Sequence, residues 1–316
     1  MTNKHFHAGE LRLQNHAGMR AKIDVMTQHL MRDFIPDQHR EFFEELEYIF
    51  LGTVDQRGLA HASIVTGSVG FASSPDPKTL IVRTGPRQDI REFDALDIGQ
   101  PVGVLGLDLS NRRRNRMHGR ISAIDEMSIN INVVQSYGNC PKYINLREIA
   151  ERNQSSGRIG ITHTAMLAPV DADLIINADT FFIASYLRDG SNAPYEGVDV
   201  NHRGGQAGFI SVDTASQITI PDYKGNDLYN TFGNLLLNPK AALLFVDFET
   251  GDQLHIHGSA SLIEDADKVS RFPGAQKLLR VEITGVTRKT ASTALIWRFI
   301  EASPVSPELR PRPQGD

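Results

Sequence analysis

The chain has 316 residues, of which 40% are hydrophobic and 22% charged, and this globular composition excludes an intrinsically disordered protein. Its 33 basic and 38 acidic residues leave a formal charge of −5, which argues against a general nucleic-acid binder. A single cysteine, Cys140, excludes an intrachain disulfide framework, and no cluster of ligands indicates a metal site. The chain shows neither a signal peptide nor the ~20 consecutive apolar residues of a membrane span, so we expect a cytoplasmic protein without a membrane partner.

The length fits two domains of roughly 150 residues each. We expect an N-terminal helical segment over residues 1–46, a first domain over 47–150, a second over 151–303, and a proline-rich, disordered tail over 304–316. Helices are few in this sequence. Residues 18–34, 41–50, 143–154 and 230–239 are the segments that we expect to be helical.

Strand-like patterns dominate the remainder of the chain. β-branched or alternating patterns predict strands over residues 65–71, 78–85, 241–248, 253–263 and 294–302. Short strands joined by glycine-rich turns are typical of small barrels. The fold class expected is therefore mainly β, a β-barrel with accessory helices.

Two segments of the chain repeat the same landmarks. A G-x-x-G-F element occurs at Gly67–Phe71 and again at Gly205–Phe209. Gly119 follows Gly70 by 49 residues, and Gly258 follows Gly208 by 50 residues. Because both the order and the spacing recur, we interpret the chain as two tandem copies of one barrel domain.

The most informative stretch lies in the second copy, over residues 226–263, with HRGGQAGFI at residues 202–210 upstream of it. A polar turn leads into a short helix, then into Asn238–Pro239, a core strand, and a strand that reaches Gly258. This ordered set resembles the pyridoxamine 5′-phosphate oxidase-like family of FMN-binding split β-barrels. The resemblance covers about residues 50–299, and it implies that a flavin lies between two barrels.

The resemblance places an FMN phosphate at the start of the short helix. A helix N-terminus suits a phosphate because its first N–H groups are unpaired and carry the positive end of the dipole. Asn230 and Thr231 are expected to cap this helix, Gly233 to permit close approach, and Arg203 to reach the phosphate. Plain capping and a surface arginine are the rival interpretations. Gly204, Lys224, Asn226 and Asn234 complete the expected phosphate site.

The resemblance also assigns contacts to the flavin ring. Gln253 stands where the family often has a ring-contacting glutamine, and Trp297 stands where it places a tryptophan. From the first copy, Arg114 and Arg116 in the basic run 112–116 are expected to meet the flavin or an anionic substrate. An exposed basic turn and a core tryptophan are the alternatives. The chain departs from simpler oxidases at Tyr229–Thr231, where a Ser-Arg-Lys run is expected, and residues 83–101 of the first copy have lost the motif.

The function implied is an FMN-dependent oxidoreductase that passes a hydride or electrons to or from an unidentified small molecule or electron donor. A non-catalytic flavin or small-ligand binding protein, and a scaffold that has lost the cofactor, are the alternatives. No catalytic acid, base or nucleophile can be named, since a flavin carries its own chemistry. The family implies a homodimer, or an internal pseudo-dimer of the two copies.

Overall fold

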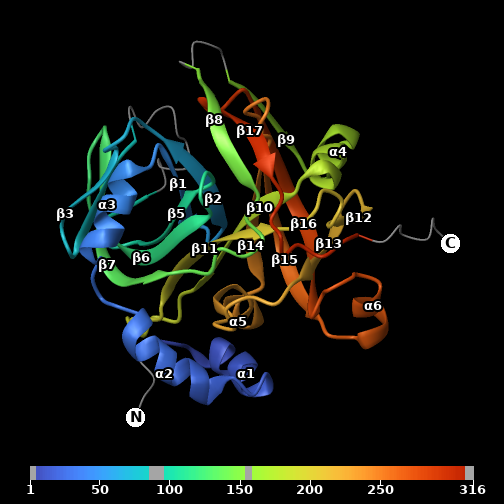
Figure 1. Cartoon of the computed structure of the whole chain (residues 1–316), viewed down its shortest axis with the longest axis horizontal. Coiled ribbons are helices and arrows are strands. Elements are labelled where there is room, and N and C mark those ends of the chain that lie inside the picture. The colour runs from blue at the N-terminus through green and yellow to red at the C-terminus, as the bar shows by residue number, and fades with distance from the viewer. Residues whose placement is uncertain (1–4, 85–95, 154–158, 310–316) are drawn as a thin grey trace. The chain divides into compact units, whose positions relative to one another are not determined.

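The computed structural model describes residues 5–84, 96–153 and 159–309 (Figure 1). The protein is mainly β, a β-barrel fold with accessory helices, as predicted. None of the helices in the described residues has the length and apolar character needed to cross a membrane.

A seven-stranded antiparallel sheet holds the first copy of the repeat. Strand β1 pairs with β2 along its whole length and with β5 over residues 49–52. Its strands pack around a core that includes Phe43, Leu80 and Ile131. In sheet order the strands are β2 (Ala60–Thr66), β1 (Tyr48–Val54), β5 (Pro101–Asp108), β6 (Arg113–Ile124), β7 (Ser128–Gly138), β4 (Thr79–Arg83) and β3 (Ala72–Asp76).

The second sheet repeats that strand order element by element. Its order is β11, β10, β14, β15, β16, β13 and β12, with β9 added beside β16. Each strand of the first sheet thus has a counterpart nine strands later, which confirms the predicted repeat. The bounds are β9 (Gly160–Thr164), β10 (Thr180–Leu187), β11 (Gly197–Gly204), β12 (Ser211–Thr214), β13 (Gln217–Asp222), β14 (Lys240–Val246), β15 (Gln253–Ile263) and β16 (Lys277–Thr290).

The glycine landmarks have matching roles in the two copies. Gly70 and Gly208 both have positive φ, 89° and 90°, a conformation that costs a side chain energy but costs glycine nothing. Both copies also have a β-bulge at the same place, before Gly119 in β6 and before Gly258 in β15. The spacing of these glycines in the sequence therefore reflects a repeated backbone path. Residues 65–71, predicted as a strand, instead form the end of β2 and a turn.

The helices agree only partly with the prediction. The predicted helix 18–34 contains α2 (Arg20–Leu30), and α5 (Asn230–Leu237) forms as expected. The predicted helix 41–50 is wrong beyond Glu45, where α3 (Asp37–Glu45) ends before β1. The predicted helix 143–154 is also wrong, because β8 (Leu146–Arg152) pairs with β17 (Leu295–Glu301) and the pairing overrides local propensity. Three further helices are α1 (Ala8–His16), α4 (Pro169–Asn177) and α6 (Ala266–Ser270).

The chain divides into two compact units, each of which draws on separate parts of the sequence. Unit 1 comprises Met1–Pro141, Ile183–Asn201 and Asn226–Ala242. Unit 2 comprises Lys142–Phe182, His202–Gly225 and Leu243–Asp316. The expected domain boundaries at residues 46, 150 and 303 stay predictions.

Candidate functional site

Unit 1 contains a cationic groove of about 620 Å³, which we call the arginine groove. One wall is apolar and comes from Met26 and Leu30 of α2. The opposite wall comes from the start of β6, the end of β7 and Asn226 before α5. Arg112, Arg113 and Arg114 line this wall, and none of the described residues that line the groove is acidic. The volume lies within the range of small-molecule sites, about 300–1,000 Å³.

The turn before β6 orients these arginines. Asp108 accepts a hydrogen bond from Asn111 (2.6 Å), and Asn111 in turn accepts one from the backbone N–H of Arg113 (2.8 Å). The Arg113 guanidinium lies 4.5 Å from the ring centre of Phe42, a cation–π contact. Arg114 donates through Nε to the carbonyl oxygen of Cys140 at 2.5 Å. Arg113 and Arg114 thus contact neutral groups at Phe42 and Cys140, and this arrangement favours an anion in the groove.

Asn115 is a buried donor in the groove wall. Its side chain is 3% exposed, and its Nδ2 has no hydrogen-bond partner among the described residues. A buried donor left without a partner costs about 1–3 kcal/mol. A ligand oxygen in the groove would satisfy this amide.

The groove brings together two of the predicted flavin contacts from distant parts of the chain. Asn226 donates to the side-chain oxygen of Asn139 at 3.0 Å, and the backbone N–H of Asn139 donates to the carbonyl of Arg114 at 3.2 Å. Arg114 and Asn226 therefore both lie on the groove wall, linked by Asn139.

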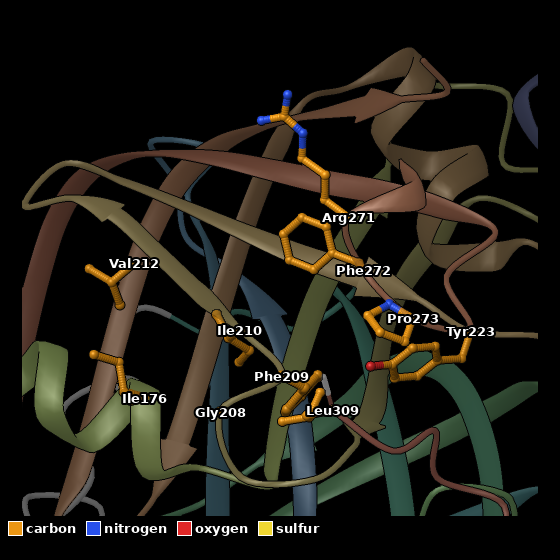
Figure 2. A pocket seen from close by; sticks show the side chains of 10 residues that line it. All are labelled: Ile176, Gly208, Phe209, Ile210, Val212, Tyr223, Arg271, Phe272, Pro273 and Leu309. Carbon is orange, nitrogen blue, oxygen red and sulfur yellow. The ribbon is translucent and has the colours of Figure 1, made fainter. Parts of the chain in front are cut away.

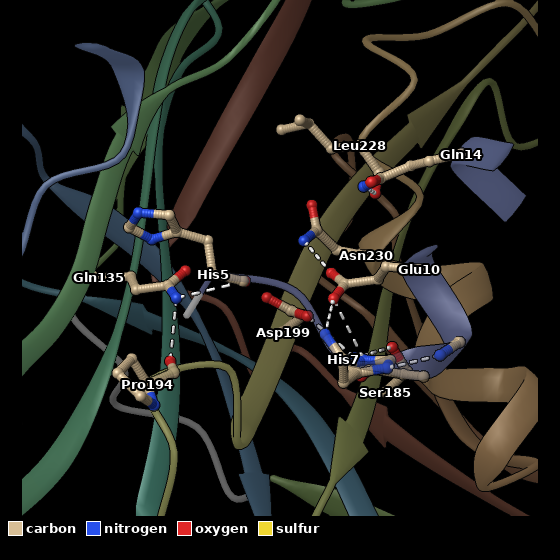
Figure 3. A network of polar contacts seen from close by, with 12 residues as sticks. His5, His7, Glu10, Gln14, Gln135, Ser185, Pro194, Asp199, Leu228 and Asn230 are labelled. Atoms are coloured by element: carbon tan, nitrogen blue, oxygen red, sulfur yellow. Dashed lines mark hydrogen bonds and ion pairs between the residues drawn. The ribbon is translucent and has the colours of Figure 1, made fainter. Parts of the chain in front are cut away.

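Three other predicted residues of unit 1 join a buried polar network instead, and Figure 3 shows the part of this network around Glu10, Asp199 and Asn230. Arg116 forms an ion pair with Asp199 at 2.5 Å, and the other oxygen of Asp199 accepts from Asn234 at 2.9 Å. Asn230 accepts hydrogen bonds from Arg116 and from the Tyr137 hydroxyl, both at 3.2 Å. The side chains of Arg116, Asn230 and Asn234 are thus committed to protein partners.

Helix α1 covers the first turn of α5 (Figure 1). Glu10 accepts a hydrogen bond from Asn230 at 2.6 Å, and His7 bonds to Asn234 at 2.9 Å. A Cβ atom built on Gly9 would lie 2.1 Å from the carbonyl oxygen of Gly233, so only two glycines permit this crossing. Burial, followed by the nearby Asp199, raises the pKa of Glu10 well above its usual range. Burial lowers the pKa of His7, so both groups favour their neutral forms.

The start of α5 does not fit a phosphate, because its first residues already have protein partners. Tyr229, in the left-handed region at φ 61°, is the N-cap, whereas Asn230 and Thr231 are the first helical residues; the expectation that they cap the helix is wrong. Thr231 accepts a hydrogen bond from Asn201 at 2.8 Å. Because α1 fills the space above Gly233, the helix end has protein partners. The arginine groove, with its unpartnered Asn115 amide, fits an anionic group better.

The remaining predicted residues belong to unit 2. Arg203 forms an ion pair with Asp222 at 2.5 Å, and Gly204 approaches the carbonyl of Tyr143 so closely that an added Cβ would lie 2.1 Å from it. The carbonyl of Lys224, whose side chain is exposed, accepts from the Tyr143 hydroxyl at 3.0 Å. In the core of this unit, Gln253 donates to Thr293 at 2.8 Å, and Trp297 packs edge-to-face on Phe248. Their roles at a flavin stay predictions.

Sequence reasoning missed Asn115, Glu10 and Asp199. Asn115 lies between two arginines that were predicted, but nothing in the sequence shows that its amide is buried without a partner. Glu10 and Asp199 reach the network from segments about 190 residues apart in the chain, and no local pattern indicates that contact. Among the described residues no group of three or more His, Cys, Asp or Glu side chains could hold a metal.

A pH effect on stability is expected from His39, which lies beside the groove. Burial, with Arg113 and Arg32 nearby, lowers the pKa of His39 to about 4, and its Nδ1 has no partner among the described residues. The unfolded chain therefore binds more protons between pH 6.5 and about 4, so stability falls as the pH drops through that window. Between pH 7 and pH 5, we expect the melting temperature of the wild-type protein to fall further than that of His39→Gln. An equal fall in melting temperature for the two proteins would contradict a lowered pKa of His39.

Comparison with known protein families finds one match, which lies within the second copy. The pyridoxamine 5′-phosphate oxidase family model matches residues 168–298. None of the curated proteins matches the chain. Several solved structures are similar to parts of it, but at TM-scores of 0.30 or less they say nothing about ligands.

Three of these structures illustrate the similarity. HupZ of Group A Streptococcus is 14% identical, with 37% of this chain and 90% of that chain covered and a TM-score of 0.29. An FMN-binding protein of Syntrophomonas wolfei is 15% identical, with 37% and 82% covered and a TM-score of 0.28. An FAD-binding protein of Mycobacterium smegmatis is 14% identical, with 40% and 98% covered and a TM-score of 0.27. The family match assigns residues 168–298, which lie within the second copy, to the pyridoxamine 5′-phosphate oxidase family, and the first copy repeats the strand order of the second.

Proposed function

We propose that the protein is an FMN-dependent oxidoreductase and that the arginine groove binds the phosphate end of the flavin. One observation carries the proposal: three arginines and a buried amide without a partner among the described residues line a groove of about 620 Å³, and none of the described residues that line it is acidic. The membership of residues 168–298 in a flavin-associated family supports the choice of ligand. FMN is preferred over FAD because its terminal phosphate carries two negative charges, which arginine forks bind strongly.

The residues of the groove have separate tasks in this proposal. Arg112 and Arg114 bind phosphate oxygens, while Asn115 and Asn226 offer amide donors to the phosphate or the ribityl chain. Met26 and Leu30 provide an apolar wall that excludes water from one side of the ligand. When bound, the flavin accepts or donates hydride or single electrons. Among the described residues that line the groove there is no carboxylate or histidine, and in this proposal its arginines and amides bind and orient the ligand.

Arg114→Gln is expected to raise the dissociation constant for FMN about 10- to 100-fold, since a hydrogen bond to a charged group contributes about 1.5–3 kcal/mol. Quenching of FMN fluorescence during titration measures the change. The exposed Arg188 is the matched control, and Arg188→Gln should bind FMN as the wild type does. Because Arg114 also bonds to Cys140, a thermal melt of each variant must first show that it is folded. Wild-type affinity in folded Arg114→Gln would refute this placement of the phosphate.

Activity is tested separately from binding. We expect NADH or NADPH to bleach the absorbance of the FMN-loaded protein and air to restore it, because an oxidoreductase must exchange electrons with a donor and an acceptor. A loaded protein that neither reductant bleaches would instead be a flavin carrier or store. This outcome would remove the oxidoreductase assignment and leave the flavin site intact.

A further inference from the structure

Unit 2 has its own pocket, of about 320 Å³, distant in sequence from the residues of the arginine groove (Figure 2). Its lining is mainly apolar and aromatic. Of the described residues in the lining, the exposed Arg271 is the single charged one (Figure 2). Ile176, Phe209, Ile210, Val212, Phe272 and Leu309 form most of the wall.

An insertion that the first copy lacks builds one side of this pocket. In the first copy, β6 passes into β7 through residues 125–127 alone. In the second copy, the corresponding strands β15 and β16 are joined by residues 264–276, which include α6. Arg271, Phe272 and Pro273 all come from this insertion. The first copy forms its sheet without such a segment, so the barrel fold does not depend on the insertion.

The segment after β17 closes another side of the pocket. The side chain of Leu309 lies 3.4 Å from the position that a Cβ on Gly208 would take, and its backbone N–H donates to Gln206 at 3.3 Å. Pro307 packs on Gly274 of the insertion. The insertion and the segment after β17 thus meet over the repeated G-x-x-G-F turn of the second copy. They leave an apolar space there rather than filling it.

The charge and size of the pocket define its ligand. Among the described residues, Arg271 takes part in no salt bridge, so its guanidinium is available to an anion at the rim. A volume of 320 Å³ holds about ten water-sized groups, taking about 30 Å³ for each. We propose that this pocket binds a small amphipathic carboxylate, with its apolar body against Phe209 and Phe272 and its carboxylate at Arg271.

Octanoate is a suitable probe, and calorimetric titration of the full chain measures its binding. We expect octanoate to bind at least tenfold more tightly than butyrate, because more of its chain is removed from water. Arg271→Gln should weaken the binding of octanoate about two- to fivefold, as expected for an ion pair near the surface, and leave the binding of octanol unchanged. Val212→Trp, which fills the pocket, should abolish binding of both.

Further variants separate a true site from misfolding and from the arginine groove. Ile176 is 44% exposed, so we expect Ile176→Asp to keep the fold. The new carboxylate would lie beside that of the ligand and repel it, so the variant should bind octanoate more weakly and octanol as the wild type does. Arg114→Gln should leave octanoate binding unchanged. The proposal is overturned if octanoate fails to bind at millimolar concentration, or if a folded Val212→Trp protein binds it normally.

Discussion

Replacement of Arg116 by methionine is expected to destabilise the protein by about 3–5 kcal/mol, the usual cost of removing one partner from a buried ion pair. The side chains of Arg116 and Asp199 are only 4% and 14% exposed. Without the guanidinium, the Asp199 carboxylate keeps its bond to Asn234 but loses its countercharge. The Tyr137 ring, whose centre lies 5.3 Å from the guanidinium carbon, also loses a cation–π partner. Urea denaturation followed by circular dichroism measures the loss.

Two controls make this result interpretable. Arg20 pairs with Asp24 at 2.6 Å on the surface of α2, with side chains 24% and 44% exposed. Arg20→Met should therefore cost less than about 1 kcal/mol. The double variant Arg116→Met with Asp199→Leu should recover part of the stability, since no buried charge remains unpaired. An Arg116→Met protein as stable as Arg20→Met would show that the buried pair is not formed.

Gly9→Val is the second change from which we expect a large effect. The first added carbon would lie 2.1 Å from the carbonyl oxygen of Gly233, and backbone at that distance cannot move aside cheaply. We expect α1 to detach from α5, which removes the bonds from His7 to Asn234 and from Glu10 to Asn230. Hydrogen exchange should then show α1 unprotected in the variant and protected in the wild type.

Ala8→Val is the matched control for this change. Ala8 precedes Gly9 in α1 but is exposed, so a valine side chain at this position extends into solvent. In the Ala8→Val protein, α1 should stay protected from exchange, and a protease should cleave this protein no faster than the wild type. If α1 stayed protected from hydrogen exchange in the Gly9→Val protein, the close crossing of the two helices at Gly9 and Gly233 would be wrong.

The repeat could be predicted because its signals are local. Gly70 and Gly208 mark positions of positive φ that glycine favours, and Gly119 and Gly258 follow β-bulges. The segment 143–154 was misjudged because its charged, helix-favouring residues pair with β17, almost 150 residues later. Local propensity contains no information on that pairing.

The candidate site could be predicted only in part. Arg114 and Asn226, both predicted as flavin contacts, line one groove, but their roles at a flavin stay predictions. Asn230 and Asn234 were expected to hold a phosphate, but they contact α1, whose docking depends on the close approach of Gly9 to Gly233. The buried amide of Asn115, which supports an anion site most directly, becomes evident only when its surroundings are known.

The absorbance spectrum of the purified protein tests the central claim most directly. The protein is mixed with FMN, desalted, and scanned from about 300 to 550 nm beside Arg114→Gln. We predict that the wild type retains the absorbance bands of bound oxidised flavin and that Arg114→Gln loses most of them. A colourless wild-type protein after desalting would contradict the flavin assignment, and equal retention by both proteins would contradict the arginine groove as its site.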